Sequence, residues 1–248
     1  MAYGCCHLSL VPVRASANDA SEMVTQLLFG DGFEILEHTK KWIKIKNAFD
    51  GYEGWINSKQ YLPINLQQFK AIKSQLLKCS TDLVEYVQSP NKQLIPVVLG
   101  SSLNSLLELD YDFDVKLSNG EIQRDKLVPT ALLYLNAPYI WGGMSPFGID
   151  CSGFTQMVYK TCGIQLRRDS SQQAQQGENL SFIEEAQPGD LAFFDNEEGK
   201  IIHVGIMMKN NYIIHAHGQV RIDRIDHTGI FNAETKSYSH KLRVIKHI

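Results

Sequence analysis

Cys151 is the residue around which this sequence could build a chemical reaction. Gly142, Gly143 and Pro146 precede it in a stretch that cannot be a regular helix or strand, and apolar residues at helical spacing follow it. We therefore expect Cys151 to begin a helix. There the unpaired backbone N–H groups and the positive end of the helix dipole favour a thiolate over a thiol. A thiolate is a nucleophile that can attack an amide carbonyl.

The motifs around Cys151 occur in a defined order. Residues 139–143 read Tyr-Ile-Trp-Gly-Gly and residues 150–154 read Asp-Cys-Ser-Gly-Phe. Further on, residues 203–206 read His-Val-Gly-Ile and residues 214–217 read Ile-His-Ala-His. In this order the motifs resemble the NlpC/P60 family of cell-wall cysteine peptidases. The resemblance covers the second half of the chain, and it implies a papain-like fold that cleaves peptide bonds in bacterial peptidoglycan stems.

The resemblance also implies roles for individual side chains. Cutting an amide needs a nucleophile, a base that takes and returns a proton, and a group that orients the base. Cys151 would be the nucleophile, His203 the base and His215 the orienting group. His217 is the alternative for the third position. The backbone N–H of Cys151 is the expected donor to the oxyanion, with the Tyr139 hydroxyl as a further candidate.

The hairpin between the two histidines decides whether they can meet. If residues 208–210 form a three-residue turn, His203 lies directly opposite His215, on the same face, with Cβ atoms about 5 Å apart. If residues 210–211 form a two-residue turn, the two histidines fall on opposite faces. The triad therefore predicts a loop with an odd number of residues.

The same residues could in principle bind zinc, because one cysteine and three histidines are potential ligands. Cys151 lacks a Cys-x-x-Cys partner, however, and His215 and His217 are two residues apart on an expected strand, a common spacing without a metal. We expect neither a metal nor another cofactor.

Short strands separated by turn signals dominate residues 1–64. Their lengths and spacing suit a small antiparallel barrel. Residues 42–45 read Trp-Ile-Lys-Ile, and residues 50–56 read Asp-Gly-Tyr-Glu-Gly-Trp-Ile. Together they resemble the bacterial SH3 modules that precede NlpC/P60 domains. This second resemblance is independent of the first.

We expect the whole chain to belong to the α+β class and to consist of three segments. Residues 1–64 would form an SH3-like domain, and residues 65–123 a connector helix followed by a second SH3-like domain. Residues 124–248 would form the papain-like NlpC/P60 catalytic domain. The predicted architecture is therefore one or two small SH3-like β-barrels followed by a cysteine peptidase.

The composition is that of a folded protein without a strong charge. A net charge of -3 over 248 residues offers no basic field for nucleic acid or an anionic membrane, so neither is an expected partner. No stretch approaches 18 apolar residues, and the first residues lack the charged and apolar regions of a signal peptide. Five cysteines show no disulfide spacing. These features favour a reducing, cytoplasmic location.

The resemblance also suggests a substrate. Family members with an N-terminal SH3 module resemble enzymes that bind a stem peptide with a free L-alanine amino end, and such an ammonium group needs carboxylate and carbonyl acceptors. The candidate substrate-binding residues are Tyr52 and Glu53 from the barrel and Tyr139, Asp150, Ser152, Asp169 and Ser170 from the catalytic domain. For Asp169 and Ser170, helix capping is the alternative role.

We therefore expect a cysteine peptidase of murein recycling. It would hydrolyse the bond from γ-D-glutamate to diaminopimelate or lysine in stem peptides with a free N-terminal L-Ala. One alternative is an amidase or acyltransferase with the same Cys-His pair, and another is a non-catalytic protein that binds cell-wall peptides. The intact Cys151 and His203 argue against the second alternative.

Overall fold

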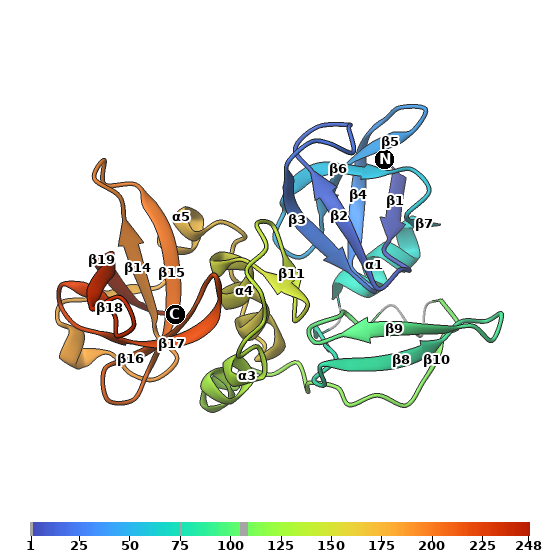
Figure 1. Ribbon diagram of the computed structural model, residues 1–248. Helices are drawn as coiled ribbons and strands as arrows, with labels where there is room; N and C mark the ends of the chain where they lie inside the picture. Colours follow the sequence, from blue (N-terminus) through green and yellow to red (C-terminus); the bar gives the residue numbers. More distant parts are fainter. Residues whose placement is uncertain (1, 75, 105–108) are drawn as a thin grey trace.

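The computed structural model describes residues 2–74, 76–104 and 109–248 and combines β-sheets with short helices (Figure 1). A seven-stranded barrel comes first, a three-stranded sheet lies below it in this view, and helices with a second seven-stranded sheet form the C-terminal half. The predicted α+β class is confirmed. Within these ranges, no helix has the length and apolar character needed to cross a membrane.

The N-terminal barrel curls one antiparallel sheet around an apolar interior, with strand order β3-β2-β6-β5-β4-β1-β7. Its strands are β1 (Ala2–Cys5), β2 (Leu10–Arg14), β3 (Met23–Leu28), β4 (Gly32–His38), β5 (Trp42–Asn47), β6 (Glu53–Asn57) and β7 (Leu62–Ile64). Successive side chains of a strand point to opposite faces, so Ile43 and Ile45 of β5 both reach the interior. There they pack with Val11, Phe33 and Ile56.

A helix and a small sheet connect the barrel to the rest of the chain. Phe69 of α1 (Leu66–Ser74) packs against Cys5 and Ile64 of the barrel, as expected for a connector helix. The sheet has the order β10-β8-β9 and consists of β8 (Val84–Gln88), β9 (Leu94–Val98) and β10 (Asp112–Phe113). That this segment is a second SH3-like domain stays a prediction.

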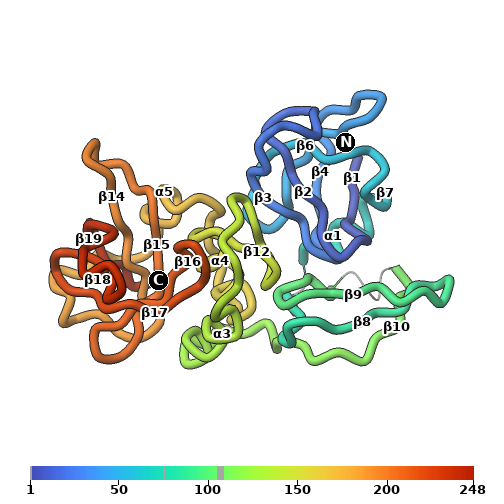
Figure 2. The backbone as a smooth tube through the Cα atoms, viewed as in Figure 1, coloured from blue at the N-terminus to red at the C-terminus, as the bar shows by residue number. Residues whose placement is uncertain are grey.

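The C-terminal half places a seven-stranded antiparallel sheet against helices, in the order β13-β19-β14-β15-β16-β17-β18. Its strands are β13 (Glu178–Leu180), β14 (Leu191–Asp195), β15 (Ile201–Met208), β16 (Tyr212–His217), β17 (Gln219–Ile225), β18 (Gly229–Asn232) and β19 (Ser237–His247). The other elements are α3 (Leu127–Leu133), the ribbon of β11 (Met144–Ser145) and β12 (Gly148–Ile149), α4 (Cys151–Thr161), α5 (Ser170–Gln173), and 3-10 turns at Arg124–Lys126 and Ile183–Glu185. The backbone trace shows α4 between this sheet and the barrel (Figure 2).

Helix α4 is the buried centre of the C-terminal half. Every residue from Cys151 to Thr161 is buried, and the helix packs on α3, β15 and β16. Phe154, Met157 and Val158 enter the largest apolar core at the predicted helical spacing. Because the core encloses the whole helix, its first residue has a fixed position beside β15 and β16.

The barrel contacts α4 through buried polar side chains. Nζ of Lys160 lies 3.0 Å from Oδ1 of Asp31, and Nε2 of Gln156 donates to Oδ2 of Asp50 at 3.0 Å. Both members of the Lys160–Asp31 pair are buried. Because a buried charge without its partner is costly, these contacts fix how the barrel sits on the helix.

Candidate active site

Cys151 is the first residue of α4, as predicted. Asp150 caps this helix: its Oδ1 accepts a hydrogen bond from the N–H of Gly153 at 2.6 Å, and its Oδ2 accepts one from Gly142 at 2.8 Å. Gly142 has a φ of 77°, and a Cβ at this position would collide with the carbonyl oxygen of Met23 in the barrel. Glycine therefore lets the loop pass between the barrel and the helix that carries the cysteine.

The thiol of Cys151 is protonated at neutral pH. Burial and then the Asp150 carboxylate raise the pKa of Cys151 to about 12, while the Val204 N–H and the Arg168 guanidinium act in the opposite direction. The predicted thiolate is therefore wrong for the resting site, because the loss of hydration outweighs the helix dipole. A base is needed to remove the proton.

His203 and His215 contact each other on neighbouring strands, as the triad requires. Nε2 of His203 in β15 lies 2.8 Å from Nδ1 of His215 in β16, and both rings are buried. Burial and then the nearby histidines hold the pKa of His203 well below its usual value, so this ring is neutral and can accept a proton. The next residue, Val204, directs its N–H at the thiol of Cys151. His217 is exposed, and its ring centroid lies 6.4 Å from that of His203, so the geometry favours His215.

The hairpin loop has an odd number of residues, as predicted, but the strand register is shifted. Gly205 pairs with His215, and residues 209–211 form a three-residue loop. The odd loop places His203 and His215 on the same face, as predicted. The turn does not consist of residues 208–210, however, so Gly205 rather than His203 lies directly opposite His215. The two rings meet diagonally, which is within reach of long side chains.

The hydrogen-bonded series continues beyond His215. Its Nε2 lies 3.0 Å from Oδ2 of Asp223 in β17, and Nε of Arg221 donates to the same oxygen at 2.7 Å. Although burial acts to raise it, the hydrogen bonds from His215 and Arg221 hold the pKa of Asp223 below its usual value. A carboxylate at Nε2 of His215 keeps the proton there, so Nδ1 accepts from Nε2–H of His203. The lone pair of His203 is then on Nδ1.

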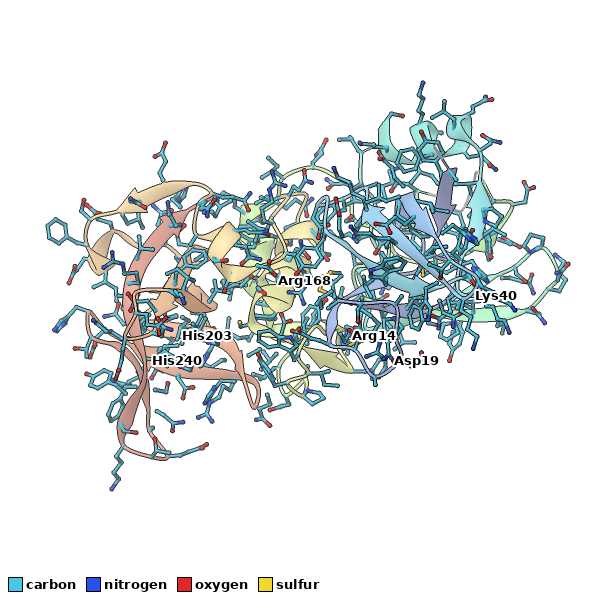
Figure 3. All side chains as sticks on the ribbon, turned by 90° about the horizontal axis from the view of Figure 1, so that it is seen from above. Arg14, Asp19, Lys40, Arg168, His203 and His240 are labelled. Atoms are coloured by element: carbon cyan, nitrogen blue, oxygen red, sulfur yellow. The ribbon has the colours of Figure 1, made fainter. Side chains whose placement is uncertain are left out.

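Arg168 forms a buried ion pair with Asp150. Its Nη2 lies 2.6 Å from Oδ2 of Asp150 and its Nη1 3.1 Å from Oδ1. Arg168 also donates to Oγ of Ser152 and to Oγ1 of Thr25 in β3, both at 2.9 Å. Figure 3 places it at the junction of the catalytic half and the barrel. Asp150 is a predicted acceptor for a substrate ammonium group, but Arg168 already neutralises its charge.

A cleft of about 470 Å³ opens beside Cys151, between the barrel and the catalytic half. The predicted residues that line it are Tyr52, Asp150, Ser152, Asp169 and Ser170. The Tyr52 hydroxyl donates to Oδ1 of Asp169 at 3.2 Å and so joins the two sides of the cleft. Burial and then Asp169 raise the pKa of Tyr52 to about 12, so its hydroxyl is a neutral donor.

Glu53 does not line this cleft. Its Oε2 lies 3.4 Å from Nζ of Lys44 on the outer side of the barrel. The prediction that Glu53 closes the groove together with Tyr52 is therefore wrong. Adjacent residues of an extended chain point in opposite directions, so only one of the two can face the cysteine.

Glu22 lines the cleft from the loop before β3. Its Oε1 accepts a hydrogen bond from Nε1 of Trp141 at 2.6 Å. In the part of the chain that the structure describes, neither Glu22 nor Asp169 belongs to an ion pair. Two carboxylates without cationic partners beside a cleft suit an ammonium group.

Most of the sequence is similar to that of known enzymes. Residues 136–238 match the NlpC/P60 family, and residues 13–60 match the bacterial dipeptidyl-peptidase Sh3 domain. A gamma-D-glutamyl-L-lysine dipeptidyl-peptidase of Bacillus cereus is 30% identical over 231 residues, which make up 80% of this chain and 68% of that relative. The chain belongs to the NlpC/P60 family. It is a cysteine peptidase, and the predicted combination of an SH3-like barrel with a papain-like domain is confirmed.

Further comparisons extend the similarity of this NlpC/P60 peptidase. The gamma-D-glutamyl-L-lysine dipeptidyl-peptidase of Bacillus subtilis is 28% identical over 217 residues, 77% of this chain and 71% of the relative. A crystal structure of an NlpC/P60 family protein from Bacillus cereus has a TM-score of 0.78 at 21% identity and covers 99% of both chains. An NlpC/P60 endopeptidase from Photobacterium damselae has a TM-score of 0.68 at 17% identity, over 98% of this chain and 70% of the other. The fold is thus shared along the full length of the Bacillus cereus structure.

Three predicted site residues of the NlpC/P60 peptidase also have structural roles. Asp169 is the N-cap of α5 and Ser170 its first residue, so capping and a position in the cleft coexist. Tyr139 forms a bridge to Ile149. Burial and then the nearby Cys151 raise the pKa of Tyr139, so its hydroxyl is neutral. Its contribution to oxyanion binding stays a prediction.

Three residues of this site were not among the predicted ones. Arg168 follows another arginine before a short helix, and Asp223 alternates with Arg221 on a strand. Glu22 lies in a polar loop without a motif. The alternation around Asp223, one strand after the histidine motif, is the only signal that could have pointed to any of them.

Proposed function

We propose that this peptidase hydrolyses the bond from γ-D-glutamate to a diamino acid, diaminopimelate or lysine, in peptidoglycan stem peptides with a free N-terminal L-alanine. The names of two relatives, at 30% and 28% identity, describe a dipeptidyl-peptidase acting on γ-D-glutamyl-L-lysine. The observation that carries the proposal is the cleft beside Cys151, which is lined by the carboxylates of Glu22 and Asp169.

In the proposed reaction, the sulfur of Cys151 attacks the carbonyl carbon of the γ-glutamyl amide while the thiol proton passes to Nδ1 of His203. The carbonyl oxygen becomes an oxyanion that accepts a hydrogen bond from the backbone N–H of Cys151. The C–N bond then breaks, and His203 gives its proton to the leaving amine. Water hydrolyses the thioester with His203 again as the base. His215 and Asp223 orient the His203 ring throughout.

Glu22 and Asp169 would receive the ammonium group of the L-alanine. Tyr52 donates to Asp169 and closes the cleft on the barrel side, so the peptide has to begin there. In a stem that is still attached to its sugar, this nitrogen is an uncharged amide. Both carboxylates then lack their cation in a partly closed cleft, which costs binding energy.

We place the reaction in the recycling of wall peptides in the cytoplasm. Free L-alanyl ends are exposed only after the sugar has been removed from the stem. Cys6, Cys79, Cys151 and Cys162 are buried thiols outside any disulfide, which suits a reducing compartment.

Cleavage of defined peptides tests the proposal, with the products weighed by mass spectrometry. We expect L-Ala-γ-D-Glu-diaminopimelate to be cut, and its N-acetylated form to have a kcat/KM at least about a hundredfold lower, roughly 3 kcal/mol. Asp169→Ala and Tyr52→Ala should reduce the ratio of kcat/KM between the free and the acetylated peptide. Glu53 is next to Tyr52 but directed away from the cleft. Glu53→Ala is therefore the matched control and should leave this ratio unchanged.

The two parts of the proposal fail in different ways. Equal rates on free and acetylated peptides would refute recognition of the amino end. The assignment of the hydrolysed bond would still hold. Cleavage of neither peptide would refute the assigned reaction itself.

A further inference from the structure

More histidines gather beside the active site than a proton relay needs. His240 of β19 stacks on His203, with 4.1 Å between the ring centroids and 21° between the planes. The ring of His217 lies 4.8 Å from that of His240. Figure 3 shows His203 and His240 side by side, at a distance from the barrel. The proposed hydrolysis assigns no role to His240.

Ring nitrogens of three of these histidines lie close together. One nitrogen each from His203, His215 and His240 lies within 4.8 Å of the other two. Zn–N bonds of about 2.0–2.1 Å place two ligands of a tetrahedral zinc ion roughly 3.3 Å apart. His240 is the most exposed of the three, so a small tilt of its ring can bring its nitrogen from the observed separation to that of a zinc ligand. Three imidazoles are a ligand set that suits zinc, copper and nickel.

The groups behind these rings resemble those of a metal centre. Nε2 of His215 contacts the carboxylate of Asp223, and Nδ1 of His240 lies 2.9 Å from Oγ of Ser239. Histidines that bind a metal commonly hold their other nitrogen in this way, which fixes the orientation of the ring.

We propose that His203, His215 and His240 bind a zinc ion and that this ion switches the peptidase off, an inference that rests on the proposed role of His203 as the base. A neutral imidazole has one lone pair in the ring plane. When zinc takes Nε2 of His203, the proton of that nitrogen moves to Nδ1. The ring can then no longer accept the proton of Cys151, so hydrolysis stops. His217 or a water molecule occupies the fourth position.

Zinc binding is measured first, independently of activity, by calorimetry on chelator-treated protein. The parent protein is Cys151→Ser, because its hydroxyl is a poor zinc ligand. We expect one ion per chain. Adding His240→Gln should weaken binding at least about a hundredfold, since even the outer partners of metal ligands contribute about 10–100-fold. His240→Phe keeps a ring stacked on His203 without a ligand atom and should give the same loss.

The matched control for binding is His227→Gln, at an exposed histidine outside the cluster, which should bind zinc as the parent does. The proposal is overturned if the parent binds no zinc, or if both His240 variants bind it as tightly as the parent.

Inhibition is then measured as the ratio of cleavage rates with and without zinc. We expect zinc to stop the native enzyme and a chelator to restore it. In His240→Phe, the zinc concentration for half inhibition should rise at least about tenfold. Equal sensitivity of both proteins would assign the inhibitory ion to Cys151 and His203 alone and refute the role of His240. If the metal-free enzyme cuts no stem peptide while the cluster binds zinc, the proposed function fails and the metal site stands.

Discussion

The guanidinium of Arg168 and the carboxylate of Asp150 form a buried two-pronged ion pair directly before the catalytic helix, with Nη2 2.6 Å from Oδ2. Asp150 caps the helix that begins at Cys151, and Arg168 also donates to Thr25 of the barrel. One ion pair therefore holds together the nucleophile, its helix and the domain that closes the cleft.

Removing Arg168 should destabilise the protein strongly. In Arg168→Met, the Asp150 carboxylate loses its buried partner, and we expect the free energy of unfolding to fall by about 3–5 kcal/mol in urea titrations. Lys200→Met is the matched control, because Lys200 forms a pair of 2.8 Å with Glu198 in which both side chains are exposed, at 74% and 68%. Its loss should cost less than about 1 kcal/mol. A similar small effect at both positions would contradict the structural role of Arg168.

The reactivity of Cys151 should report a protonated thiol. Burial raises its pKa to about 12, so only a small fraction is thiolate at neutral pH. We expect the rate of alkylation by iodoacetamide, followed by mass spectrometry, to keep rising from pH 7 to pH 10, because each unit increases the thiolate fraction. A rate that is already constant near pH 7 would show a stabilised thiolate and refute this resting state.

The relay behind the base should show graded effects on kcat. His203→Ala removes the proton acceptor and should lower kcat by about 10²–10⁴-fold, whereas Cys151→Ala should abolish turnover. His215→Ala should cost less, and His215→Asn should retain more activity than His215→Ala because an acceptor for His203 remains. Steady-state kinetics on the free stem peptide measure this order. Near-native turnover in Cys151→Ala would refute the mechanism.

Acid should weaken the fold through the histidine cluster. Burial and then neighbouring histidines lower the pKa of His240 to about 4 from 6.5, and the pKa of His203 and of His215 is lowered as well. Below pH 6.5 the unfolded chain therefore binds more protons than the folded one. The stability that the neutral, buried histidines contribute is fully present above about pH 6.5 and is lost as the pH falls toward 4. We expect the urea midpoint to decline across this range.

His240→Phe separates this effect from general acid denaturation. The variant removes one titrating group of the cluster, so its urea midpoint should decline less steeply between pH 6.5 and 4. Parallel curves for the variant and the native protein would contradict a contribution from His240.

The sequence by itself determined the parts of the site that depend on neighbouring residues. The glycine-rich loop and the apolar spacing after Cys151 predict where α4 begins, because both are set by backbone freedom and helical period over a few residues. The parity of the hairpin loop follows in the same way from the requirement that His203 and His215 share a face.

Only the tertiary structure decided what surrounds these residues. Arg168 reaches Asp150 and the barrel at once, and Glu22 reaches the cleft from a distant loop, and neither contact leaves a local pattern in the sequence. The protonated state of Cys151 likewise depends on burial by elements far apart in the chain, which outweighs the local effect of the helix end. Such properties arise from long-range packing, and sequence spacing does not encode which distant side chains meet.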